Sequence, residues 1–366
     1  MYRVTELDVP ATMTDDPAKV RAFREWVDVS NRSEIAVHGL AELAWKAEEQ
    51  LPQQHDPDAP SRLFLVRDEH DTAVAAGSYD SKTAPGTTNC WVSIGVDPDH
   101  RRRGVGTLLA DHLEGIARAE GRTQWKTYAV SRQVGPASGS GFVQAPTGFG
   151  AVPADEAGVC FLTGRGWHFG QVNRISRLGL PADPTQIGRI HAEASAAAGA
   201  QYRVHTWTGA TPARWEADIA VLETRMSTDA PQGGMDEPED VWTVERLRER
   251  EAQQLTAPRT MLTIAVEDVV STTLAGFSQL AVPHDVTQPV FQWDTLVLRE
   301  HRGHRLGWLL KVVGIETVER DHPGHPSIVT FNAEENRPML DVNEAVGFVG
   351  VGSEGVWERR VDVPAL

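Results

Sequence analysis

The sequence predicts a mixed α+β (α/β) protein made of two tandem copies of one domain, each with a mixed central sheet flanked by helices. Three observations predict this fold class. An apolar strand, a basic turn and a helical pattern follow one another at residues 90–117 and again at 291–313. Matching strand-like runs flank both segments. The chain has 366 residues, and a core of that size usually splits into two domains of roughly 150 to 200 residues.

The first copy is expected to alternate strands with helices. Its strands are short apolar runs bounded by polar or turn-forming residues. Its long helix is predicted because Val105, Leu109 and Leu113 recur near the helical period. In order, we expect strands at 63–67, 73–79 and 90–96, a helix from 105 to 117, a strand at 125–130 and a short helix ending at Gly166-Trp167.

The second copy repeats this order. Its long helix is indicated by the stripe of Leu306, Leu309, Leu310 and Val313. We expect strands at 261–266, 274–280 and 291–297, a helix from 306 to 313, a strand at 328–331 and a short helix ending at Gly347-Phe348. Residues 178–184 carry two prolines and a glycine between the copies, so domains are expected at 1–180 and 181–366.

Composition limits the classes of function. Hydrophobic residues make up 40% and charged residues 23%, as in globular proteins, and no apolar run approaches the roughly 18 residues of a membrane span. Two cysteines are too few for a disulfide framework or a cysteine-based metal site. A net charge of −16 disfavours a large nucleic-acid footprint. We therefore expect a cytoplasmic protein with no metal and with neither a membrane nor a nucleic acid as partner, its oligomeric state left open.

The basic turn of the first copy predicts an anion site. A strand that ends in a glycine-containing turn and opens a helix leaves unpaired backbone N–H groups with the helix dipole behind them. Arg101, Arg102 and Arg103 add positive charge there, while Gly104 and Gly106 leave room for a phosphate to approach. A diphosphate suits this turn, although neither the Walker loop nor the dinucleotide fingerprint is present.

This turn resembles motif A of the GNAT acetyltransferase superfamily, in which the Arg/Gln-x-x-Gly-x-Gly/Ala loop binds the pyrophosphate of acetyl-CoA. The matching positions are Arg101, Gly104 and Gly106, preceded by Val96. The resemblance covers nearly the whole chain as two copies, and it implies acetyl-CoA or another acyl-CoA as cosubstrate. The residues it assigns to the cosubstrate in the first copy are Val96, Arg101, Arg102, Arg103, Gly104, Val105, Gly106 and Thr107.

The second copy departs from this pattern, because Arg305 stands where the family usually has glycine. The corresponding cosubstrate residues are Val297, Arg302, Gly303, His304, Arg305, Leu306 and Gly307. Asn332 and Asn336 match asparagines that contact the CoA arm in the family, and helix capping is the other interpretation of both. The tyrosine that serves as the family acid is replaced by Leu162 in the first copy and by Asn343 in the second.

Acyl transfer from a thioester to an amine requires a base for the amine and a donor near the carbonyl oxygen. In the strand before the second loop, Asp294 is either that base or a structural hydrogen-bonding group. Asp294 and Asn332 are the expected catalytic residues, which places the chemistry in the second copy.

The leading hypothesis is an acyl-CoA-dependent N-acetyltransferase that transfers an acetyl or small acyl group to the amine of a small molecule. Two alternatives remain. One is a non-catalytic CoA-binding or structural protein, suggested by Leu162, Asn343 and Arg305. The other is an aminoacyl-tRNA-dependent transferase, a class that is also built from tandem GNAT-like domains.

Overall fold

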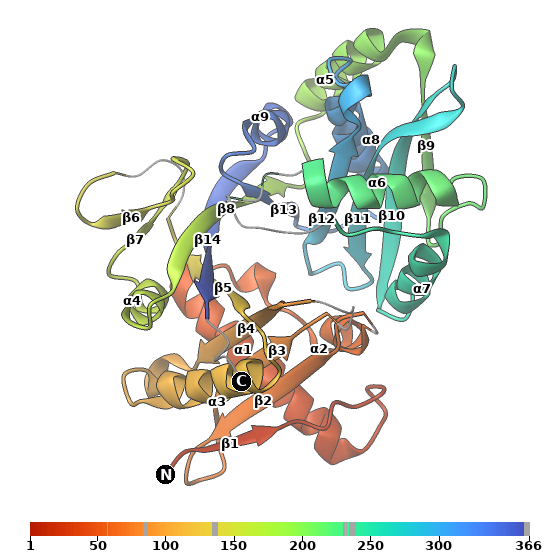
Figure 1. The fold of residues 1–366 in the computed structure, drawn as a ribbon. Coiled ribbons are helices and arrows are strands. Elements are labelled where there is room, and N and C mark those ends of the chain that lie inside the picture. Colours follow the sequence, from red (N-terminus) through yellow and green to blue (C-terminus); the bar gives the residue numbers. More distant parts are fainter. Residues whose placement is uncertain are drawn as a thin grey trace. The chain divides into compact units, whose positions relative to one another are not determined.

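The computed structural model describes residues 1–56, 58–82, 87–133, 138–229, 231, 233 and 239–361. The chain forms two compact units. Unit 1 contains Met1–Pro146, Ala151–Val172 and the C-terminal residues from Glu354 on, and unit 2 contains Thr147–Gly150 and Asn173–Ser353. Each unit holds one of the two predicted copies (Figure 1). No helix in the described ranges combines the length and the apolar character needed to cross a lipid bilayer.

Unit 1 is a mixed sheet with helices on both faces. The strands are ordered β1-β2-β3-β4-β5, antiparallel except for the parallel pair β4–β5. The elements are β1 (Arg3–Glu6), α1 (Pro17–His38), α2 (Ala47–Gln50), β2 (Ser61–Arg67), β3 (Ala73–Asp80), β4 (Asn89–Val96), α3 (Val105–Ala119), β5 (Gln124–Ser131), β6 (Phe142–Gln144), β7 (Ala151–Pro153) and α4 (Ala157–Gly164). Every strand and helix predicted for the first copy is present.

Unit 2 repeats the arrangement with the order β9-β10-β11-β12-β13-β8, in which β12 and β13 form the parallel pair. Its elements are β8 (His168–Gly179), α5 (Pro184–Ala198), β9 (Tyr202–Thr208), α6 (Glu216–Asp229), α7 (Val244–Gln254), β10 (Arg259–Asp268), β11 (Thr273–Pro283), β12 (Val290–Val297), α8 (Leu306–Asp321), β13 (Ser327–Ala333), α9 (Arg337–Ala345) and β14 (Val349–Arg360). The helix α6 crosses in front of β10–β12 in Figure 1.

Each sheet separates two apolar clusters. In unit 1 the long helix α3 buries Val105, Leu109 and Leu113 on one face, and α1 buries Phe23 and Val27 on the other. In unit 2 the helices α5 and α8 cover one face, and α6 and α7 cover the other. The predicted helical stripes are therefore the core-facing sides of α3 and α8.

The last strand of each copy pairs within the other unit. β8 follows α4 in the chain, and its residues Asn173–Gly179 pair antiparallel with β13 of unit 2. β14 follows α9, and its residues from Glu354 on belong to unit 1, where β14 neighbours β5. This exchange explains why the units differ from the expected division at 180/181. The proline-rich segment 178–184 marks the end of β8 rather than the change of unit.

In both units the parallel strands separate after a short paired stretch. β4 and β5 pair only from Asn89 with Gln124 to Trp91 with Lys126, and β12 and β13 pair only from Val290 with Ile328 to Gln292 with Thr330. Beyond these pairs the facing edges of the strands diverge. The basic turns follow the free ends of β4 and β12, so the divergence and the turns belong to one region of each unit.

Replacing Trp357 by alanine tests whether the C-terminal strand completes the core of unit 1. The Trp357 side chain is 2% exposed and stacks on Phe169 with ring centroids 4.8 Å apart. We expect Trp357→Ala to lower the free energy of unfolding by about 3–5 kcal/mol, because it leaves a large cavity. Val349→Ala, at the 60% exposed start of the same strand, should change it by less than about 0.5 kcal/mol. Denaturant unfolding measures both, and equal effects would contradict the assignment.

Candidate active site

The two basic turns have the same backbone conformation with the glycine at different positions. In unit 1 Arg102 and Gly104 have φ values of 61° and 80°, and in unit 2 the equivalent Gly303 and Arg305 have φ values of 90° and 55°. Both positions are left-handed, where a non-glycine residue is strained. Each turn therefore has one glycine and one arginine in this conformation. The two turns keep the same geometry although the positions of glycine and arginine are swapped between them.

The turn of unit 1 is an open cradle of backbone donors. Gly104 caps α3 with no side-chain hydrogen bond, so the first N–H groups of the helix have no intrahelical partner. A Cβ built on Gly104 would meet no atom within 4 Å, whereas one on Gly106 would lie 3.5 Å from Val96 and 3.6 Å from Phe161. The cradle accepts an anion from the Gly104 side without steric hindrance, and its donors suit a diphosphate.

The three arginines of this turn have different environments. The Arg101 guanidinium donates to the Val96 carbonyl at 3.2 Å and to the Ser33 carbonyl at 2.8 Å, so it fastens the turn to β4 and α1. Burial lowers the pKa of Arg101. Arg102 and Arg103 are exposed, and no described residue pairs with either side chain. Of the three, these two guanidiniums are the ones available to an anion.

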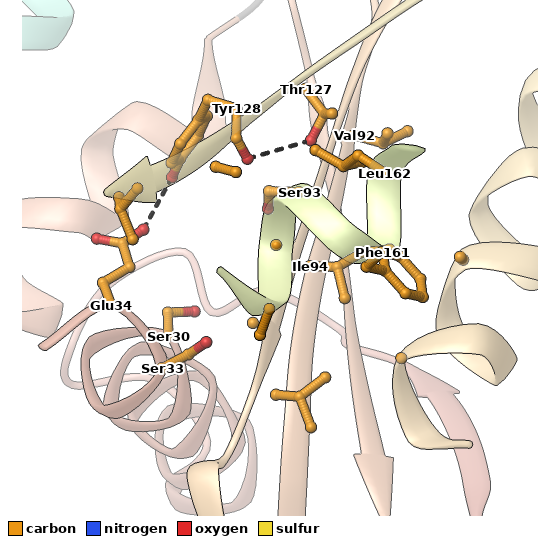
Figure 2. A pocket seen from close by; sticks show the side chains of 18 of the residues that line it. Ser30, Ser33, Glu34, Val92, Ser93, Ile94, Thr127, Tyr128, Phe161 and Leu162 are labelled. Atoms are coloured by element: carbon orange, nitrogen blue, oxygen red, sulfur yellow. Dashed lines mark hydrogen bonds between the residues drawn. The ribbon is translucent and has the colours of Figure 1, made fainter. Parts of the chain in front are cut away.

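A cavity of about 650 Å³ connects this turn to the opposite face of the sheet, entirely within unit 1. It passes between the diverging strands, with Ser93 and Ile94 of β4 on one side and Tyr128 of β5 on the other (Figure 2). Helix α3 lines it with Gly106, Thr107 and Ala110, and α4 lines it with Phe161 and Leu162. The cavity is open to long, narrow ligands that lie along the unpaired edge of β4.

Glu34 and Tyr128 meet at the end of the cavity that α1 lines. The Tyr128 hydroxyl donates to the Glu34 carboxylate at 3.0 Å, as Figure 2 shows. Burial raises the pKa of Glu34, and the neighbouring Glu34 carboxylate raises the pKa of Tyr128 well above its ordinary value. Burial, with Glu34 adding to it, raises the pKa of Glu354 on β14 to about 8. Glu34 and Tyr128 thus line the cavity as a hydrogen-bonded pair, and the Glu354 carboxyl acts on both residues from β14.

In unit 2 the arginines of the turn are bound to other residues. Arg302 donates to the Val297 carbonyl at 3.1 Å, as Arg101 does in unit 1, and forms an ion pair with Asp229 at 2.8 Å. Arg305 forms an ion pair with Glu193 at 2.7 Å, and its guanidinium lies 4.8 Å from the ring centroid of Trp308. The Arg305 side chain therefore turns towards α5 rather than towards a ligand.

Large side chains occupy the part of unit 2 that corresponds to the cavity. The equivalents of Thr107 and Ala110 are Trp308 and Lys311. Lys311 is 1% exposed, its Nζ lies 5.6 Å from the centroid of the Phe348 ring, and burial lowers its pKa to about 7. Phe348 corresponds to Trp167, which lines the cavity of unit 1 together with Ala110. The Lys311 side chain thus takes up space that is open in unit 1.

The two residues expected to be catalytic lie on opposite faces of unit 2. The pairs Ser278–Thr295 and Leu280–Gln292 leave Asp294 in an irregularity of β12. Burial raises the pKa of Asp294, and Glu223 on α6 and Arg250 on α7 are its charged neighbours. Asn332 instead accepts a hydrogen bond from Asn343 of α9 at 2.7 Å. Because α9 packs on α8, whereas α6 and α7 cover the other face, the structure does not bring Asp294 and Asn332 together.

The remaining predicted positions divide between main-chain and packing roles. Asn336 caps α9 and accepts a hydrogen bond from the Met339 N–H at 3.4 Å, as expected from the helix-capping interpretation of this asparagine. Val105 and Leu306 are core residues, 1% and 2% exposed, so only their backbone faces the turns. His304 packs at 5.2 Å from the Tyr202 ring centroid. Gly303 and Gly307 belong to the turn and first helical residues of unit 2, as Gly104 and Gly106 do in unit 1.

Sequence reasoning missed Glu34 and Glu354. Glu34 and Tyr128 are 94 residues apart and their contact leaves no local pattern. Glu354 belongs to the exchanged strand. The one available signal was the helical spacing of Ser30, Ser33 and Glu34, which places polar groups on one side of an otherwise core-facing helix.

The fold and this geometry agree with comparisons to known proteins. Residues 22–131 match the acetyltransferase (GNAT) family model. A tandem GNAT protein from the clavulanic acid biosynthesis pathway superposes with a TM-score of 0.72 over 100% of both chains at 23% identity. A GCN5-related N-acetyltransferase from Sphaerobacter thermophilus has a TM-score of 0.63 over 99% of this chain and 97% of its own, at 14% identity.

A third similar structure is the N-myristoyltransferase of Saccharomyces cerevisiae, with a TM-score of 0.54 over 98% of this chain and 80% of its own, at 10% identity. No curated protein sequence matches the chain. The chain has the tandem GNAT fold, and its residues 22–131 form a domain of the GNAT acetyltransferase family. The resemblance drawn from the two turns is confirmed.

Glu354→Gln tests the proton held by the buried Glu354 carboxyl. The pKa of the Glu354 carboxyl rises from 4.5 to about 8 on folding, so between these pH values the folded state binds a proton that the unfolded state has lost. The free energy of unfolding therefore falls as the pH rises from about 4.5 to about 8. Glutamine resembles the protonated form. We expect Glu354→Gln to raise the Tm relative to wild type increasingly from pH 5 to pH 8, whereas Glu354→Asp keeps the ionisable group. Thermal unfolding against pH measures this, and a pH-independent difference would contradict the assignment.

Proposed function

We propose that the protein is an acyl-CoA-dependent N-acyltransferase whose working site lies in unit 1, with an acetyl or other small acyl group transferred to the amine of a small molecule. The observation that carries the proposal is the continuous cavity between the open turn and the Glu34–Tyr128 pair. Membership of residues 22–131 in the GNAT family supports the same chemistry. Two of the similar structures are named as acyl-transferring proteins, one an N-acetyltransferase and the other an N-myristoyltransferase.

The residues of the turn fit the diphosphate of an acyl-CoA. The N–H groups from Gly104 to Thr107 supply donors at the start of α3, and Arg102 and Arg103 supply charge. The unpaired edge of β4 from Val92 to Val96 offers main-chain donors and acceptors to the amides of the pantetheine arm. The acyl-CoA supplies an activated thioester.

The chain contributes a proton acceptor and a polar enclosure for the amine. Glu34, held by the Tyr128 hydroxyl, lines the same cavity as the turn. A carboxyl with a raised pKa exchanges protons with an amine more readily than an ordinary one. Starting from the ammonium ion, the C–N bond forms and the C–S bond breaks, one nitrogen-bound proton is accepted by the thiolate, and a second passes through the carboxylate to solvent.

Unit 2 is proposed to bind no acyl-CoA, in contrast to the expectation that the second copy carries the chemistry. Arg305 is engaged with Glu193, and Lys311 fills the space corresponding to the cavity. A cosubstrate could enter this space only if the Lys311 side chain left its buried position. One working site among two copies is therefore the simplest interpretation.

Gly104→Asp tests acyl-CoA binding in unit 1, and Arg305→Asp is the matched change at the equivalent left-handed position of unit 2. We expect Gly104→Asp to abolish acetyl-CoA binding, because a carboxylate would face the phosphates and several bonds of about 1.5–3 kcal/mol each would be lost. Arg305→Asp should leave the affinity unchanged. Calorimetry with acetyl-CoA decides, and the reverse result would assign binding to unit 2.

Thr107→Trp tests whether the side chains of unit 2 exclude the cosubstrate. Thr107 is exposed at the first turn of α3, so the substitution copies Trp308 without disturbing a core. We expect a loss of acetyl-CoA affinity of at least about tenfold with an unchanged Tm. Ala110→Lys, which copies Lys311, should act in the same direction. Acetyl-CoA binding equal to wild type in both variants would refute the role given to these side chains.

Asp294→Asn and Asn332→Ala test the alternative site in unit 2. If unit 1 works alone, both variants should retain wild-type turnover in a thioester-consumption assay against an amine library. A fall of roughly 10²-fold in kcat for Asp294→Asn at wild-type stability would instead assign the base to unit 2.

A further inference from the structure

Helix α1 presents a mixed stripe to the cavity of unit 1. Ser30, Ser33, Glu34 and Val37 recur at spacings of three and four residues, so they share one side of the helix, and all four line the cavity. Glu34 is the one charged member of the stripe. Figure 2 shows its carboxylate directed towards Tyr128, near Ser30 and Ser33.

The Glu34 carboxylate has no cationic partner among the described residues. Its hydrogen bond comes from the neutral Tyr128 hydroxyl at 3.0 Å. The charged groups that act on this pair are acidic: Glu354 from β14 acts on both residues, and Asp80 from β3 acts on Tyr128. Arg101 reaches α1 next to Glu34, but its guanidinium donates to the carbonyls of Ser33 and Val96. The Glu34 carboxylate therefore has acidic neighbours and forms no ion pair with any residue in the described ranges.

Apolar side chains line the same cavity as this carboxylate. Val37 lies one turn beyond Glu34 on α1, and Trp45 lines the cavity as well. The backbone of Trp45 is fixed by Asn31, whose side-chain amide donates to the Trp45 carbonyl at 2.8 Å and accepts from the Trp45 N–H at 2.9 Å. These two hydrogen bonds hold the Trp45 backbone beside α1. A ligand at Glu34 thus meets a negative charge with a rigid apolar wall next to it.

We propose that the acceptor of unit 1 is a primary amine carried on an apolar or aromatic body, with its ammonium group bound to the Glu34 carboxylate and its body lying against Val37 and Trp45. The proposal rests on the acyl transfer proposed above and names the class of acceptor. A carboxylate on the carbon that bears the amine is disfavoured, because it would lie close to Glu34 and Glu354.

The same arrangement assigns Glu34 two tasks. The ionised carboxylate binds the ammonium ion, and it then takes one proton from the nitrogen so that the free amine attacks the thioester carbonyl. The C–N bond forms and the C–S bond breaks, the departing thiolate takes up a proton, and one proton is released to solvent. No oxidant or further reactant is required.

Three amines of graded chemistry test the class of acceptor. 2-Phenylethylamine has both the cation and the aromatic body, phenylalanine adds a carboxylate, and ethylamine lacks the body. Calorimetry with the full chain in saturating coenzyme A at pH 8 should give 2-phenylethylamine an affinity at least about tenfold above each of the other two. Its affinity should fall as the pH is lowered and Glu34 becomes protonated.

Glu34→Gln should remove the preference for 2-phenylethylamine over phenylalanine while leaving coenzyme A binding intact. Glu34→Asp keeps a carboxylate at this position and should keep the direction of the preference, which guards against a folding defect in the first variant. Glu223→Gln, a buried acid of unit 2, is the matched control and should change nothing.

Equal affinities for the three amines, no measurable binding of any of them, or an unchanged preference in Glu34→Gln would overturn the proposal. In each of these cases retained coenzyme A binding leaves the proposed function standing. Loss of coenzyme A binding in the wild type would instead refute the proposed function.

Discussion

The divergence of β4 from β5 is the constraint on which the rest of unit 1 depends. A parallel pair inside a sheet normally satisfies its main-chain groups along its whole length. Here pairing stops at Trp91 and Lys126, so the edge of β4 beyond it is unsatisfied within the sheet. The same divergence opens the cavity, which both the turn of α3 and the α1 stripe line. In the proposed function, a ligand in this cavity would supply the hydrogen-bonding partners that β4 lacks.

Unit 2 has the same divergence, so backbone geometry alone does not make a site. Its turn keeps both left-handed residues, and its parallel pair stops after three residue pairs. What differs is side-chain volume at two helical positions, where Thr107 and Ala110 are replaced by Trp308 and Lys311. Burying a lysine amine in an apolar cluster is unfavourable unless it is neutral, in keeping with the pKa of about 7 that burial imposes. Lys311 thus helps to close the space of unit 2, although burying its amine is itself unfavourable.

The parts of the molecule that were predictable from the sequence are those with local causes. The strands and helices of both copies follow from periodicity, and the turn of Arg101 to Gly106 follows from the requirement for glycine beside a helix start. The exchange of β8 and β14 was not predictable, because strand pairing partners are chosen by contacts between distant segments. The same holds for Glu34, whose partner Tyr128 is brought to it by the sheet. Asp294 and Asn332 lie on the neighbouring strands β12 and β13, but the irregularity in β12 and the contact with α9 direct them to different faces.

The strand exchange also gives a physical reason why a copy with a filled cavity remains part of the protein. β14 begins with residues of unit 2 and ends in unit 1, where Trp357 is buried and Arg359 forms an ion pair with Glu114 at 3.1 Å. Glu114 itself is nearly buried on α3 and also pairs with Arg165 at 2.8 Å beside α4. Without the second copy, unit 1 would lose Trp357, the ion pair of Arg359 with Glu114, and Glu354 together. The second copy thus supports the first through the strand it delivers, and this role requires neither an open turn nor an empty cavity in unit 2.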